Sequence, residues 1–174
     1  MQQRHQKFLE KLRASEIARF FVGMWLSSLG FEITLHPQKY APTHEQWRDY
    51  SDDGDIEAKD SDGNKYRIEV KERTLSFTCK ENFPYPDIFV CTVHSWENAQ
   101  IKPSAFISLN QELTHIAIVY AHSFKEWDTR DVWDKQFGRD QTCYVAPKSA
   151  VTFREIRINH ERETEPTTEN MSVR

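Results

Sequence analysis

The chain has 174 residues, a formal net charge of −4 and a sequence pI near 6.0. This length supports one domain with a sizeable core. The acidic balance argues against a tight non-specific nucleic-acid binder, but it leaves open a protein whose basic residues gather locally. Three widely spaced cysteines without a C-x-x-C pair indicate neither a disulfide framework nor a zinc knuckle, and we expect reduced thiols in a cytosolic protein. We see no signal peptide and no apolar run of membrane-spanning length.

The first predicted element is a helix from Lys7 to Leu29, which Gly30 ends. Glu16 lies four residues from both Leu12 and Phe20, so it shares an apolar stripe and we expect its carboxylate to be partly buried. A glutamate on the flank of the helix, paired with an arginine or with solvent, is an equal alternative. The apolar residues recur at three- and four-residue steps: Phe8, Leu9, Leu12, Ile17, Phe20, Phe21, Met24, Trp25 and Leu29.

A strand is predicted at 31–35, followed by a long loop at 36–52. Aromatic and basic residues interleaved on such a loop suit contacts with phosphates and bases. Attachment of the loop to the body of the domain by its aromatic residues is the interpretation we favour. The loop carries His36, Lys39, Tyr40, His44, Trp47, Arg48 and Tyr50.

Residues 53–71 predict a β-hairpin whose turn is 61–63, with Gly63 in the positive-φ position. Alternation places five apolar side chains on one face: Ile56, Ala58, Tyr66, Ile68 and Val70. The other face is polar and holds Asp55, Glu57, Arg67, Glu69 and Lys71.

Two cross-strand pairs of charged residues on the polar face indicate what this face could bind. Glu57 opposite Arg67 is a favourable pair, whereas Asp55 opposite Glu69 places like charges together. A divalent cation between these carboxylates removes that repulsion, because hard cations prefer oxygen ligands. Lys71 emerges on the same face, where an amine can orient water or stabilise developing charge. An ordinary solvated hairpin is the alternative.

Asp55, Glu69 and Lys71, spaced as D-x13-E-V-K, resemble the motif of the PD-(D/E)xK phosphodiesterase superfamily, which includes restriction enzymes. The resemblance covers about residues 8–75. It implies an α/β (α+β) fold with a central mixed β-sheet, flanking helices and a restriction-endonuclease-like core. It also implies one or two Mg²⁺ (or Mn²⁺) ions held by Asp55, Glu69 and the backbone carbonyl of Val70. Glu16 matches the glutamate that the first core helix of this superfamily often aims at the metal.

The second half of the chain departs from that pattern, because it predicts strands where many members have a helix. Strands are expected at 87–93, 105–109, 115–121, 143–147 and 150–158, with a loop at 95–104. A helix is predicted from Phe124 to Phe137, capped by Ser123 and ended by Gly138. Arg73 either extends the site or forms a surface ion pair. The dipeptide Pro86-Asp87 is not the "PD" of the motif, because no E-x-K follows it at hairpin distance.

The sequence therefore predicts one nuclease-like domain over 1–158 and a disordered tail over 159–174. The expected function is metal-dependent hydrolysis of DNA, with Asp55, Glu69, Lys71 and Glu16 as catalytic residues and a homodimer left open. The main alternative is a non-catalytic module that binds nucleic acid or protein on the same scaffold. A structural or regulatory protein with solvated hairpin charges is a third.

Overall fold

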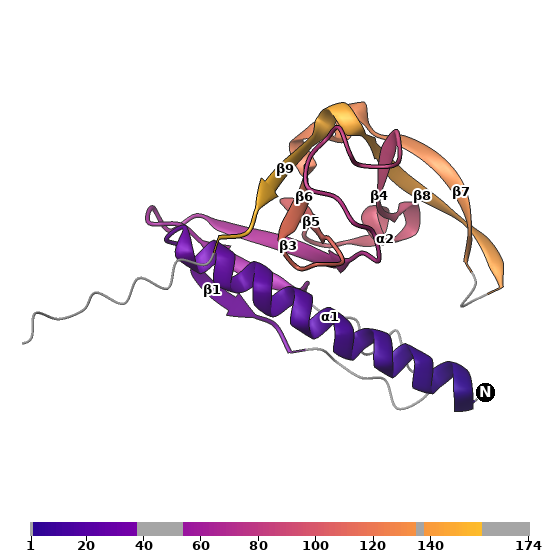
Figure 1. Cartoon of the computed structure of the whole chain (residues 1–174), viewed down its shortest axis with the longest axis horizontal. Helices are drawn as coiled ribbons and strands as arrows, with labels where there is room; N and C mark the ends of the chain where they lie inside the picture. The colour runs from indigo at the N-terminus through magenta and orange to yellow at the C-terminus, as the bar shows by residue number, and fades with distance from the viewer. Residues whose placement is uncertain (1, 38–53, 135–137, 158–174) are drawn as a thin grey trace, which may run out of the picture.

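The computed structural model describes residues 2–37, 54–134 and 138–157, and only the backbone of 2–14. Its centre is a six-stranded mixed sheet, with a long helix on one face and a three-stranded sheet beyond the other (Figure 1). The helices and strands are α1 (Gln2–Ser28), β1 (Glu32–Leu35), β2 (Ile56–Lys59), β3 (Lys65–Glu72), β4 (Asp87–Thr92), α2 (Val93–Asn98), β5 (Ala105–Leu109), β6 (His115–Tyr120), β7 (Asp128–Asp134), β8 (Arg139–Pro147) and β9 (Val151–Glu155). Short 3₁₀-helices cover Ala121–Glu126 and Lys148–Ala150.

The strand order of the central sheet is β1-β2-β3-β5-β6-β9. β1, β2 and β3 form an antiparallel meander, and β5 then runs parallel to β3. A parallel neighbour requires a crossover connection, and here the crossover contains β4 and α2. β4 pairs with β8 in the second sheet, whose order is β4-β8-β7. The predicted α/β class with a mixed central sheet and a strand-rich second half is confirmed.

Two apolar clusters cover the two faces of the central sheet. One cluster joins α1 to the face that carries Ile56, Ile68, Val70 and Ile107. The other joins the opposite face, through Phe106, to the second sheet and α2. The second cluster includes residues of β5, β6 and β9 but none of β1, β2 or β3, so the polar side chains of β2 and β3 on that face lie outside this packing.

The β2–β3 hairpin has the predicted register. Ala58 pairs with Tyr66 and Ile56 pairs with Ile68. The Asp60 amide donates to the Asn64 carbonyl at 3.0 Å, and Gly63 has a φ of 85°. The predicted apolar face of the hairpin is therefore the face that packs against α1.

α1 turns a different side toward the sheet from the one predicted. Ala18 and Val22 are buried, whereas Ile17 and Phe20 are 53% and 55% exposed. A Cβ at Gly23 would lie 3.2 Å from the Leu35 Cδ2 atom, so the helix backbone approaches the sheet closely. Ala18 and Gly23 permit this approach. Of the predicted apolar pattern, Ile17, Phe20 and Leu29 remain outside, whereas Phe21 and Trp25 pack against the core.

Two secondary-structure predictions after residue 92 were wrong. The expected loop holds α2, whose first turn is capped by Thr92 accepting from the Ser95 amide at 3.0 Å. The helix expected over 124–137 is a 3₁₀-helix up to Glu126 and then β7 from Asp128 to Asp134, and the Thr142 hydroxyl donates across the hairpin to Asp131 at 2.8 Å. Pairing with β8 along all of β7 overrides the local helical signal.

Some predictions fall outside the described residues, namely most of the 36–52 loop and the tail over 159–174. The single-domain boundary at 158 stays a prediction. In the described part of the chain, no helix combines the length and the apolar character needed to cross a membrane.

Candidate active site

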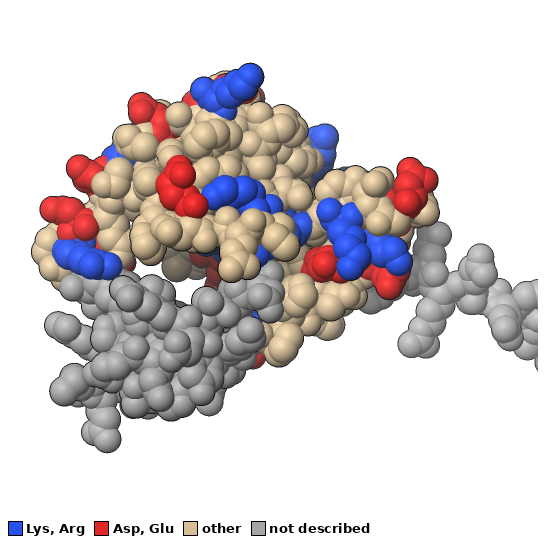
Figure 2. All heavy atoms as spheres, turned by 180° about the vertical axis from the view of Figure 1, so that it is seen from behind, with Lys and Arg blue, Asp and Glu red and all other residues tan. Residues whose placement is uncertain are grey.

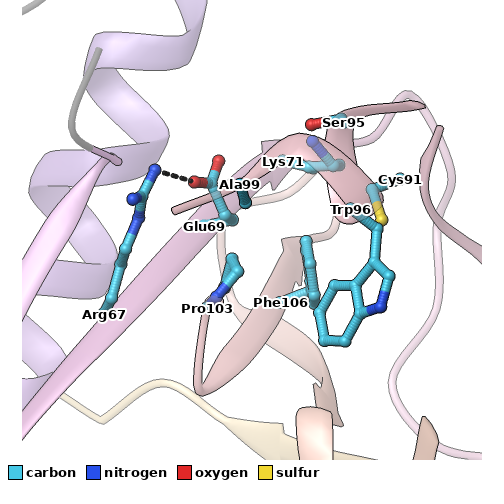
Figure 3. A pocket seen from close by; sticks show the side chains of 9 residues that line it. All are labelled: Arg67, Glu69, Lys71, Cys91, Ser95, Trp96, Ala99, Pro103 and Phe106. Atoms are coloured by element: carbon cyan, nitrogen blue, oxygen red, sulfur yellow. Dashed lines mark hydrogen bonds and ion pairs between the residues drawn. The ribbon is translucent and has the colours of Figure 1, made fainter. Parts of the chain in front are cut away.

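β3 directs Arg67, Glu69 and Lys71 away from α1, along one wall of a pocket (Figure 3). Ser95 and Trp96 of α2 form another wall, and Lys71 lies on the side nearest Ser95. The three β3 residues share this wall because residues two apart in a strand point to the same face. Three of the five residues on the predicted polar face therefore line a pocket, whereas Asp55 and Glu57 do not.

Asp55 lies immediately before β2, on the α1 side of Glu69. Its Oδ2 atom accepts from the Val70 amide at 2.7 Å, and its Oδ1 atom lies 3.4 Å from the Arg19 Nε atom. Burial, and then the charge of Glu69, raises the pKa of Asp55 to about 6, against the Val70 hydrogen bond, Arg19 and Lys71. The hydrogen bond to the Val70 amide holds the Asp55 carboxylate beside β3, where the charge of Glu69 acts on it, although Asp55 does not line the pocket itself.

Arg19 is the residue that α1 contributes to this region, and the sequence analysis missed it. It is 5% exposed, and one guanidinium NH₂ donates to the backbone carbonyls of His36 and, at 3.1 Å, Asp55. The sequence did contain a signal for Arg19. It precedes Val22 and Leu26 by three and seven residues, and this helical spacing places it on the buried stripe of α1. A buried arginine in such a stripe calls for a carboxylate partner.

Arg67 does not form the ion pair expected from its place opposite Glu57. Glu57 instead pairs with Lys65, whose Nζ lies 2.9 Å away. Arg67 turns along its own strand, with one NH₂ 3.4 Å from Glu69 Oε1 and another 3.3 Å from the Ile101 carbonyl. The cross-strand register was therefore right and the predicted ion pair was wrong.

The Arg67 guanidinium lies against a glycine. A Cβ at Gly54 would lie 2.5 Å from the Arg67 Nε atom, and Gly54 has a φ of 98°. The buried Nε atoms of Arg67 and Arg19 find no hydrogen-bond acceptor among the described residues. An unsatisfied buried donor costs about 1–3 kcal/mol, so these two groups are held in place by packing rather than by full hydrogen bonding.

The structure leaves Glu16 and Arg73 outside this arrangement. Glu16 is exposed on α1, so the prediction of a partly buried carboxylate was wrong. Like Phe20, Glu16 lies on a side of α1 that does not face the sheet. Arg73 donates to the Phe89 carbonyl at 2.6 Å and the Ser108 hydroxyl at 3.2 Å. Burial lowers its pKa to about 10, and Arg73 joins β4 to β5 rather than extending the site.

The oxygen donors near Asp55 fit a hard divalent cation that keeps several water ligands. They are the carboxylates of Asp55 and Glu69, whose mutual repulsion contributes to the raised pKa of Asp55. Among the described residues, no group of three or more His, Cys, Asp or Glu side chains is arranged to hold a metal. A cation here depends on two carboxylates, a backbone carbonyl and water.

Charge over the molecular surface is mixed. On the face in Figure 2, small groups of Lys and Arg alternate with Asp and Glu, and the described residues form no continuous basic surface in this view. This agrees with the net charge of −4. Any attraction for a polyanion is therefore local.

The sequence matches no known protein family and no curated protein. Among solved structures, the fold is similar to that of a bacterial homing endonuclease, with a TM-score of 0.40 and 14% identity. The similarity covers 72% of this chain and 83% of the endonuclease chain. A likeness this distant assigns no activity to the chain.

Proposed function

We propose that the chain is a metal-dependent nuclease of the PD-(D/E)xK type that hydrolyses phosphodiester bonds in DNA. The observation that carries the proposal is the convergence of Asp55, Glu69 and Lys71 beside the β2–β3 hairpin, where the Glu69 charge acts on the Asp55 carboxylate. The order of elements supports it, since α2 lies in the β3–β5 crossover, where the resemblance implied a helix.

In the proposed mechanism, a Mg²⁺ or Mn²⁺ ion would be held by Asp55, Glu69 and the backbone carbonyl of Val70. When bound, such an ion supplies a Lewis acid for the phosphate and lowers the pKa of water. Arg19 fixes the position of Asp55 by contacting both its carboxylate and its carbonyl. Glu16 has no part in this mechanism, because it is exposed and Arg19 is the α1 residue beside Asp55.

Lys71 is proposed to orient the attacking water and to stabilise the charge that develops during the reaction. Its amine orients the attacking water. As the water oxygen bonds to phosphorus, the bond from phosphorus to the leaving oxygen breaks, and the proton released by the water passes through solvent to the leaving oxygen. The positive charge of Lys71 offsets the negative charge that grows on the phosphoryl oxygens. Trp96 and Phe106 line the pocket with buried apolar side chains, and the lower local polarity strengthens these electrostatic interactions.

The test is cleavage of a panel of linear, branched and single-stranded DNA with Mg²⁺, Mn²⁺ or EDTA. Metal-dependent cutting by the wild type, and its loss in Asp55→Asn, Glu69→Ala and Lys71→Ala, is the expected result. Lys65→Ala is the matched control, because Lys65 lies on the same strand but pairs with Glu57 outside the pocket. Full activity in any of the three site variants, each folded by circular dichroism, contradicts the residue assignment.

A non-catalytic binding module on the same scaffold is the second candidate. The observation that favours it is that both carboxylates already have arginine partners, Arg19 for Asp55 and Arg67 for Glu69. Metal binding separates the two candidates, since a ligand at 100 times its Kd stabilises the folded state by about 2.7 kcal/mol. A nuclease should show a Mg²⁺-induced rise in Tm that Asp55→Asn removes, whereas a binding module should show no rise. The homodimer stays a prediction.

A further inference from the structure

We infer that Arg67 is the residue that binds the phosphodiester anion at this site. The inference rests on the proposed function and deepens it, because it names the group that receives the charged part of the substrate. The three β3 side chains in the pocket then have separate roles: Glu69 is a metal ligand, Lys71 orients the attacking water, and Arg67 binds a phosphoryl oxygen.

The position of Arg67 supports this task. Its side chain is 22% exposed and lines the pocket that Glu69 and Lys71 also line, with the guanidinium directed toward Glu69 (Figure 3). A ligand that reached Glu69 through this pocket would therefore meet Arg67 at the same time. A fully buried arginine, such as Arg19, has no such access.

The hydrogen bonds of Arg67 leave donors available. A guanidinium has five N–H donors in a fixed fork that matches the oxygens of a phosphate. In Arg67, the contacts to Glu69 and to the Ile101 carbonyl are long, at 3.4 and 3.3 Å, so the two terminal nitrogens keep donors for a ligand, whereas Nε is buried against Gly54 and out of reach. The residue that could have taken Arg67 across the strands, Glu57, is paired with Lys65 instead.

The backbone around Arg67 is shaped to hold the guanidinium. Gly54 leaves open the space that the Arg67 Nε atom occupies, and any side chain at position 54 would collide with it. When Glu69 holds a cation, its attraction for Arg67 is reduced by the charge of that cation, and the Arg67 NH₂ group becomes free to take an anion. The metal and the phosphodiester are then bound by neighbouring residues of one strand.

The experiment measures DNA binding without cleavage, as well as cleavage. Fluorescence anisotropy with labelled duplex and single-stranded DNA, in Ca²⁺ over a series of salt concentrations, gives the affinity and its salt dependence. Single-turnover cleavage in Mg²⁺ gives the rate on the DNA that the wild type cuts. The variants are Arg67→Ala, Arg67→Lys and the control Lys65→Ala, which removes one positive charge from the same strand.

Arg67→Ala is expected to weaken DNA binding roughly 10- to 100-fold, as for loss of a charge-assisted hydrogen bond. It should also reduce the slope of log affinity against log salt by about one. Arg67→Lys should keep the slope and recover part of the affinity, because lysine keeps the charge but lacks the fork. Lys65→Ala should leave both quantities unchanged. A purely structural role for Arg67 predicts a changed Tm and an unchanged salt slope.

The outcomes separate the two levels of the argument. If the wild type cuts DNA and Arg67→Ala binds it with wild-type affinity and slope, the inference is wrong and the proposed function stands. The inference is equally wrong if Lys65→Ala loses as much of the slope as Arg67→Ala, because Arg67 then contributes only general charge. If the wild type neither binds nor cuts any DNA, the proposed function fails and the inference falls with it.

Discussion

The raised pKa of Asp55 predicts how the stability of the folded protein changes with pH, and this can be measured without a substrate. Asp55 has a pKa of about 6, raised from 3.8 by burial and by Glu69. A carboxyl whose pKa is higher in the folded state than in the unfolded state binds its proton more tightly when folded. The metal-free protein should therefore gain stability from Asp55 as the pH falls. This gain is complete below pH 3.8 and is lost as the pH rises through about 6.

The size of the effect follows from the two pKa values. Over the whole titration, the difference is worth about 3 kcal/mol, because a tenfold change in proton affinity corresponds to about 1.4 kcal/mol. Between about pH 8 and pH 5, the gain from Asp55 is about 1.4 kcal/mol, since pH 5 lies only one unit below the folded-state pKa. For a chain of this length, that free energy raises the Tm by about 3 to 6 °C.

The assay is thermal unfolding of the wild type and Asp55→Asn in EDTA from about pH 8 to pH 5. The asparagine variant carries the titrations of all other groups, so the difference between the two proteins isolates Asp55. With saturating Mg²⁺ the acid gain of the wild type should disappear, because the metal needs the ionised carboxylate. A wild type and a variant whose Tm values follow parallel curves in EDTA would refute the argument that Asp55 is a buried carboxyl crowded by Glu69.

Two further predictions concern the residues that hold this region. At about pH 8, Arg19→Ala should lower the free energy of unfolding by about 3–5 kcal/mol, because it leaves the Asp55 carboxylate buried without its partner. Glu16→Ala, three residues away on the exposed side of α1, should cost far less in the same urea titration, and equal losses would contradict the assigned role of Arg19. Gly54→Ala should destabilise the protein more than Gly63→Ala. Both substitutions incur a cost of about 1–3 kcal/mol for the positive φ, but only position 54 adds a collision with Arg67, so equal urea midpoints would show that this collision is relieved without cost.

The hairpin could be predicted from the sequence because its information is local. The period-two pattern of Ile56, Ala58, Ile68 and Val70 fixes which face is buried, and Gly63 fixes the turn. Together they determine the register, and the register brings Asp55 to Glu69. The parts of the site that lie on this one hairpin were therefore accessible without any knowledge of the rest of the fold.

The parts that failed depend on contacts distant in sequence. The helix expected after Ser123 is a strand because β8 pairs with it, and nothing within 124–137 records that partner. The face of α1 was misplaced because Gly23 lets the helix lie close to Leu35, and that contact belongs to the sheet rather than to the helix. Glu16 was proposed and Arg19 was missed for the same reason, because the sequence alone did not show which side of α1 meets β2 and β3.

The two arginines give the site a property that the three-residue motif alone does not have. Asp55 and Glu69 repel one another, yet each contacts an arginine, so the repulsion is partly compensated before any metal arrives. Arg19 is buried and cannot leave Asp55 without unfolding the contact between α1 and β2. Arg67 borders the pocket and holds Glu69 only at 3.4 Å, so it can be released. The charge of Asp55 is therefore offset by an arginine that stays in place and fixes the position of the carboxylate. The charge of Glu69 is offset by an arginine that can be released. If Glu69 holds a metal as proposed, the exchangeable arginine beside it would couple the binding of that metal to the binding of an anion.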